Sequence, residues 1–199
     1  MRRLIDPHLE ALAARLDGGW LRANAVTWLG LLFGLGAIVC IGRGRYLEAL
    51  LLFALNRFLD GLDGALARRQ GITDLGGYLD IVLDFIVYGG LAFAFALADP
   101  PRNALYAAFL LFAFMGTASS FLAFAIMAGK RGLSTDRCGP KSLYYLGGLA
   151  EGTETIIFFL LCLLWPQQFS LFATVFAIIC WLTTAGRVAT ALQMLREPK

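Results

Sequence analysis

Charged and metal-binding side chains are scarce in this sequence. Only 16% of its 199 residues are charged, whereas a soluble domain typically has about 25%. His8 is the single histidine, and no two of the four cysteines form a C-x-x-C pair. The sequence therefore argues against a Cys/His zinc site and a disulfide framework, and a Ser-His-Asp triad would have to use His8. A net charge of +3 is also too small to indicate a nucleic-acid partner.

Apolar residues are abundant instead. They make up 59% of the chain, including 16 phenylalanines, which is more than one soluble domain can bury. A membrane-spanning helix needs about 20 mostly apolar residues. Short gaps with glycine, proline or charge separate six such stretches: residues 25–41, 47–67, 75–98, 104–128, 143–165 and 169–194. We therefore expect an all-α integral membrane protein, with residues 1–199 as one domain and residues 23–199 as a bundle of six transmembrane helices.

Residues 1–22 have a different pattern. Asp6 is a candidate N-cap with Pro7 at the first helical position. Leu9, Leu12 and Leu16 then fall on one helical face, which predicts an N-terminal amphipathic helix lying in the membrane interface. A plain polar lead-in is the alternative, and the segment lacks the compact apolar core of a signal peptide.

Lysine and arginine predict the orientation. If the N-terminus is inside, the outer segments hold only Arg43, Arg45 and Arg102. The cytoplasmic segments then hold twelve basic residues: Arg2, Arg3, Arg15, Arg22, Arg68, Arg69, Lys130, Arg131, Arg137, Lys141, Arg196 and Lys199. We expect both termini on the cytoplasmic side of a bacterial inner membrane.

Four aspartates lie at the cytoplasmic ends of two neighbouring predicted spans. Asp60 and Asp63 are spaced i, i+3 and Asp80 and Asp84 are spaced i, i+4, so each pair shares a helical face. Acidic residues in or beside a span are costly and usually functional. Four carboxylates brought together need a counter-charge, and their hard oxygen ligands favour Mg²⁺ or Mn²⁺. Solvated charges at helix ends are the alternative.

These residues belong to a longer motif. The stretch Asp60-Gly-Leu-Asp63-Gly64-Ala-Leu-Ala67-Arg68, followed by Gly76, Asp80 and Asp84, resembles the signature of the CDP-alcohol phosphatidyltransferase family, D-x-x-D-G-x-x-A-R then G-x-x-x-D-x-x-x-D. The spacer at residues 69–75 has seven residues, where the family often has eight. Asn24 and Thr27 resemble the family's N-x-x-T, with Ala23 where proline is frequent.

The resemblance implies an activity and roles for these residues. The family transfers a phosphatidyl group from a CDP-linked lipid such as CDP-diacylglycerol to a small alcohol and releases CMP. Asp60, Asp63 and Asp80, with Asp84, would hold two metal ions, and Asp84 would also be the catalytic base. Gly76 is the signature glycine. The CDP-donor-binding residues would be Asn24, Thr27, Gly64, Arg68 and Thr73. An ordinary helix N-terminus remains the alternative for Asn24 and Thr27.

The acceptor is not indicated by the motif. Arg131 and Lys141 are candidate ligands of an acceptor phosphate, although the positive-inside bias alone explains them. Glu151 and Glu154 either help to choose the acceptor or pair with Arg57 or Arg187. The family is commonly dimeric, so a homodimer is expected.

A small proton- or ion-coupled transporter is the alternative function, with Asp80 and Glu151 as relays. The acids, however, gather at one membrane face, and the spans show no paired discontinuous segments. A non-catalytic scaffold would not need four aligned aspartates and an arginine.

Overall fold

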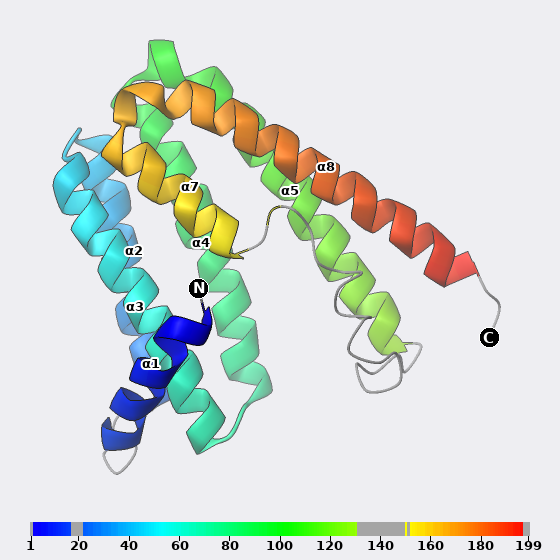
Figure 1. Cartoon of the computed structure of the whole chain (residues 1–199). Helices are drawn as coiled ribbons and strands as arrows, with labels where there is room; N and C mark the ends of the chain where they lie inside the picture. The colour runs from blue at the N-terminus through cyan, green and yellow to red at the C-terminus, as the bar shows by residue number, and fades with distance from the viewer. Residues whose placement is uncertain (1, 17–21, 131–149, 151, 197–199) are drawn as a thin grey trace. The chain divides into compact units, whose positions relative to one another are not determined.

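Helices make up nearly all of the computed structural model, which describes residues 2–16, 22–130, 150 and 152–196 (Figure 1). Within these residues there is no strand. The chain divides into two compact units, Met1–Ala98 and Asp99–Lys199.

The first unit has four helices joined by short turns. They are α1 (Arg2–Leu16), α2 (Ala23–Gly42), α3 (Tyr46–Gln70) and α4 (Asp74–Ala98). The turns use glycine at positive φ: Gly44 at 70° follows α2, and Gly71 at 103° ends α3, conformations that other residues rarely adopt. Helix α2 packs against both α3 and α4, and α1 packs against α3. This arrangement brings the carboxyl end of α3 beside the start of α4.

Helix α1 buries its apolar face against the protein. Leu9 and Ala13 lie in a core cluster with Leu62 and Leu66 of α3, and Leu12 packs at its edge. Within this unit these side chains contact residues of α2 and α3, and the amphipathic helix at the membrane interface stays a prediction.

The predicted start of α1 is wrong. The helix begins at Arg2, so Asp6 is not its N-cap and Pro7 lies inside it. A proline ring fixes φ near the helical value, so one proline close to the N-terminal end costs a backbone hydrogen bond but does not stop the helix.

The second unit contains α5 (Pro100–Lys130), α7 (Gly152–Leu164), the short 3₁₀ helix η1 (Pro166–Gln168) and α8 (Phe169–Arg196). Helix α5 packs along α8, and aromatic rings fill the unit's interior. Phe114 contacts Phe159 and Phe176, and Phe158 stacks on Phe176 with ring centroids 4.6 Å apart.

Prolines 100 and 101 were expected in a gap but form the first turn of α5. Proline suits that position because its missing N–H has no partner in a first helical turn. Asp99 caps the turn, because its Oδ1 accepts a hydrogen bond from the backbone N–H of Arg102 at 3.3 Å.

Four of the described helices are long and apolar enough to cross a membrane. They span Ala23–Gly42, Asp74–Ala98, Pro100–Lys130 and Pro166–Leu195. Their exposed side chains include Leu32 at 65% and Leu105 at 76%, and such apolar surfaces suit contact with lipid. Helix α3 is as long as α4 but carries the charged residues of the motif, and α7 has 13 described residues. Whether these two also cross the membrane stays a prediction.

Candidate active site

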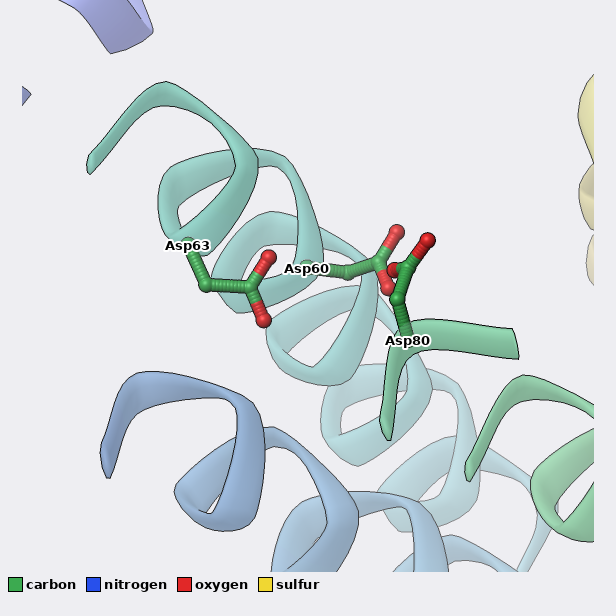
Figure 2. A group of neighbouring side chains, drawn as sticks. All are labelled: Asp60, Asp63 and Asp80. Carbon is green, nitrogen blue, oxygen red and sulfur yellow. The ribbon is translucent and has the colours of Figure 1, made fainter. Parts of the chain in front are cut away.

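Three of the four motif aspartates form one cluster. Asp60 and Asp63 project from α3 and Asp80 from the first turns of α4, and their carboxylates point into a common space (Figure 2). One oxygen from each lies within 4.8 Å of the others. The helical spacing and the tight turn at Gly71 together produce this arrangement.

The cluster fits a divalent cation. Asp63 is 6% exposed, and its buried Oδ2 has no hydrogen-bond partner among the described residues. A buried carboxylate oxygen without a partner is unusual, because its desolvation is not compensated. Hard oxygen donors brought close together are the ligand set that Mg²⁺ and Mn²⁺ prefer. Of the four carboxylates expected to meet, three therefore lie within reach of one ion, and metal binding by them stays a prediction.

Asp84 lines the same cavity but is not part of the three-carboxylate cluster, and it forms an ion pair with Arg57. Its Oδ1 is 2.9 Å from Nη2 of Arg57, and Nη1 of the same arginine is 3.6 Å from Oδ2 of Asp60. The arginine side chain is only 10% exposed, whereas the two aspartates are 31–32% exposed. A mostly buried cation thus compensates part of the negative charge of the site.

Arg57 was not recognised as a site residue from the sequence. Its pairing with Glu151 or Glu154 was considered, and the structure instead pairs it with Asp84 and Asp60. The available signal was its position, one helical turn before Asp60 on the same face. Asn56, which is 3% exposed, lines the same cavity and donates a hydrogen bond to the carbonyl of Gly30 at 2.9 Å.

Three of the five predicted donor-binding residues lie at the starts of α2 and α4. Thr27 lines the cavity together with Asp63, and its hydroxyl donates to the carbonyl of Ala23 at 3.1 Å. Thr73 caps α4, because its Oγ1 accepts a hydrogen bond from the N–H of Gly76 at 3.1 Å. Asn24 is next to this cap: a Cβ added to Gly76 would be 3.4 Å from the Asn24 Oδ1 and 3.2 Å from the Thr73 Oγ1. The lack of a side chain at Gly76 therefore allows the starts of α2 and α4 to approach each other closely.

Arg68 and Gly64 lie outside the cavity lining. The Arg68 side chain is 50% exposed, and its Nη2 is 3.9 Å from Oε1 of Glu10 on α1. A Cβ added to Gly64 would have Arg68 Nη1 as its nearest neighbour, at 3.7 Å. Gly64 directly follows Asp63 and is partly exposed, and Arg68 lies one helical turn further along α3 and is exposed.

Among the candidate acceptor ligands, the structure describes only Glu154. It is exposed in the first turn of α7, in the second unit. Arg131, Lys141 and Glu151 lie outside the described residues. In the same unit, Arg187 donates to the carbonyl of Thr117 at 3.1 Å and lies over the ring of Phe121.

Residues 20–193 match the family model of CDP-alcohol phosphatidyltransferase, and the chain belongs to that family. It is 50% identical to the inner membrane protein YnjF of Escherichia coli, over 97% of this chain and 94% of that protein. It is also 28% identical to archaetidylinositol phosphate synthase of Pyrococcus horikoshii, over 98% of this chain and 96% of the relative.

The fold has a solved counterpart. The crystal structure of Mycobacterium tuberculosis phosphatidylinositol phosphate synthase with CDP-DAG bound matches with a TM-score of 0.72 and 23% identity, over 92% of each chain. This likeness concerns the fold.

Family membership supplies the reaction class. The chain is a multi-pass membrane protein that transfers a phosphatidyl group from a CDP-linked lipid to an alcohol, releasing CMP, in phospholipid biosynthesis. Enzymes of the family depend on divalent metal ions in general, and the aspartate cluster provides a candidate site for them. The reaction class favours the transferase over the transporter alternative.

Proposed function

We propose that the cavity lined by α2, α3 and α4 is the transferase site, with CDP-diacylglycerol or a similar lipid as donor. The observation that carries this proposal is the convergence of the Asp60, Asp63 and Asp80 carboxylates within 4.8 Å, with Asp84 lining the same cavity. Two Mg²⁺ or Mn²⁺ ions are the proposed cofactors, held by Asp60, Asp63, Asp80 and, at the edge of the cluster, Asp84. Bound divalent cations would neutralise the pyrophosphate and the charge that gathers on the departing CMP.

Asp84 is the proposed general base. In the transfer, the acceptor's hydroxyl oxygen bonds to the lipid-side phosphorus, and the bond from that phosphorus to the bridging oxygen of CMP breaks. The hydroxyl proton passes to a carboxylate oxygen of Asp84, and CMP leaves with the bridging oxygen. Two observations support this role. Asp84 lines the cavity, and the contact of its Oδ1 with Arg57 orients the carboxylate.

The donor's nucleotide is proposed to lie along the starts of α2 and α4. Thr27, Asn24 and Thr73 offer hydroxyl and amide groups there, and the absence of a side chain at Gly64 leaves room above α3. Arg68 is half-exposed, and its ion-pair contact among the described residues is with Glu10 at 3.9 Å, a long distance that leaves its planar fork able to bind a phosphate.

For the membrane arrangement, we propose that α3 and α7 complete a set of six spans and that both units work as a single domain. The extent of the family model supports the single domain, since residues 20–193 cover both units. We also propose that α1 lies at the membrane interface and that the chain forms a homodimer. Both termini and the site are proposed to lie on the cytoplasmic side of an inner membrane. The lysine and arginine distribution supports the orientation.

The function is tested with purified protein in detergent, incubated with labelled CDP-diacylglycerol, Mg²⁺ and a panel of acceptors. Inositol phosphate belongs in the panel because relatives are named for inositol phosphate products, beside glycerol 3-phosphate, serine and simpler alcohols. Lipid mass spectrometry identifies the product, and CMP release gives the rate. We expect one acceptor to yield a new phospholipid and Asp80→Asn to yield none. Absence of CMP release with every acceptor would contradict the proposal.

A further inference from the structure

Arg57 is not part of the family motif, yet its side chain contacts three residues that line the cavity, Asn56, Asp60 and Asp84. Its guanidinium presents five N–H donors in one plane. Nε donates to Oδ1 of Asn56 at 2.8 Å, Nη1 donates to the hydroxyl of Tyr88 at 2.7 Å, and Nη2 lies 2.9 Å from Asp84 Oδ1. These three contacts point in different directions and fix the plane of the group.

The network joins three helices. Asn56, which accepts from Arg57, donates through Nδ2 to the carbonyl of Gly30 on α2. Tyr88 and Asp84 are one turn apart on α4, and the arginine itself is on α3. The guanidinium carbon is also 5.0 Å from the centre of the Tyr88 ring and 5.7 Å from that of Phe53, so cation–π contacts hold it from the apolar side.

A role in binding a substrate phosphate fits this environment poorly. The Arg57 side chain is 10% exposed, and its donors already point at protein acceptors on the cavity wall. A phosphate that took the place of Asn56 or Tyr88, which are 3% and 8% exposed, would leave a buried acceptor without a partner, which is costly. Arg68, at 50% exposure, is far more accessible to a phosphate.

We propose that Arg57 is a positioning residue that fixes the carboxylate of Asp84 in the orientation needed to accept the acceptor's proton. The inference rests on the proposed role of Asp84 as the base. Because Asn56 and Tyr88 hold the guanidinium group in place, its Nη2 stays directed toward Asp84. This contact restricts the rotation of the Asp84 carboxylate. Partners that orient a functional group are typically worth about 10–100-fold in activity.

The central test is Arg57→Lys, which keeps the positive charge but has no planar fork to contact Asn56, Tyr88 and Asp84 together. We expect kcat for CMP release to fall about 10–100-fold, while KM for the CDP donor and for the acceptor changes much less. Arg45→Lys is the matched control: Arg45 also pairs with a residue on α3, Glu48 at 2.9 Å, but is exposed and distant in sequence from the motif. This control should retain wild-type turnover.

A double-mutant comparison separates positioning from a purely structural role. If Arg57 acts through Asp84, adding Arg57→Lys to Asp84→Asn should lower turnover no further, because the base is already absent. A loss in the double variant equal to the product of the two single losses would overturn the proposal. So would a raised KM with unchanged kcat for Arg57→Lys, which would make Arg57 a substrate-binding residue.

Tyr88→Phe provides a second route if Arg57→Lys does not fold. It removes the hydroxyl that accepts from Nη1 but keeps the ring under the guanidinium. We expect a smaller fall in kcat than for Arg57→Lys, with unchanged KM values, and wild-type kcat in the folded Tyr88→Phe protein would contradict the inference. Failure of the proposed function is distinguishable, because it would appear as absent CMP release in the wild-type protein itself.

Discussion

Asp84→Asn is the change that best separates the roles of the four aspartates. The substitution keeps the shape of the side chain and removes its charge and its ability to take a proton. Asp60, Asp63 and Asp80 still form their cluster, and the proposed nucleotide contacts are unchanged. We therefore expect the variant to bind divalent metal and the CDP donor, but to turn over slowly.

The size of each effect follows from the contacts of Asp84. A positioned general base is worth about 10²–10⁴-fold in rate, which corresponds to about 2.7–5.5 kcal/mol of activation free energy. The cost in stability should be smaller. Arg57 loses one charged partner but keeps Asp60 at 3.6 Å and the acceptors Tyr88 and Asn56. Since the Asp84 side chain is 31% exposed, we expect a cost of about 1–3 kcal/mol, between that of an exposed and a buried ion pair.

The assay is paired. Calorimetry measures binding of the CDP donor with Mg²⁺, and CMP release measures turnover, for Asp84→Asn and for Asp80→Asn. The second variant should lose donor binding and turnover together, because Asp80 belongs to the carboxylate cluster. If Asp84→Asn abolishes donor binding as completely as Asp80→Asn, then Asp84 is a metal ligand and the base is another group. Full turnover in Asp84→Asn would refute the reasoning outright.

Three further predictions follow from the site and its packing. EDTA should abolish CMP release, and Asp60→Asn, Asp63→Asn or Asp80→Asn should do so in folded protein; full activity in any two of these variants would contradict the metal assignment. Arg68→Lys should raise KM for the CDP donor more than it lowers kcat, because an ammonium cannot make bidentate phosphate contacts, and an unchanged KM would limit Arg68 to a topological role. Gly34→Ala should lower the free energy of unfolding by about 1–3 kcal/mol, since its Cβ would be 2.6 Å from the Val87 Cγ2. Gly42→Ala is the control, because nothing lies within 4 Å of the added Cβ. Equal thermal stability of the two variants would contradict this packing argument.

Residue patterns were enough to predict the helical class of the fold and the acidic half of the site. Apolar runs of about 20 residues predict membrane helices because a bilayer offers the backbone no other hydrogen-bond partners. The i, i+3 and i, i+4 spacings placed each aspartate pair on one face, and the motif placed both pairs at neighbouring helix ends. Which aspartates share a helical face is a local property, and spacing along one helix is enough to determine it. Three of the four carboxylates, those of Asp60, Asp63 and Asp80, lie together in the structure, and their role as metal ligands stays a prediction.

Helix boundaries were predicted less well, because they depend on how proline and capping groups are used. Pro7 and Pro100 were both treated as marking helix edges, yet α1 extends before Pro7 and α5 begins at Pro100. A proline is compatible with the first turns of a helix, so its presence alone does not fix where the helix starts.

The pairing of the charges depends on how the helices pack and could not be predicted from residue patterns. From the sequence, Arg57 had several possible carboxylate partners, and no pattern linked it to Asn56 or Tyr88. The packing of α2 against α3 and α4 selected Asp84 and Asp60 for Arg57, and Gly30 for Asn56. It also separated Arg68, on the exposed side of α3, from the cavity that contains the aspartates. Spacing along one helix determines which residues share a face, whereas the partner across a helix interface depends on rotation and distance between helices that the sequence pattern does not specify.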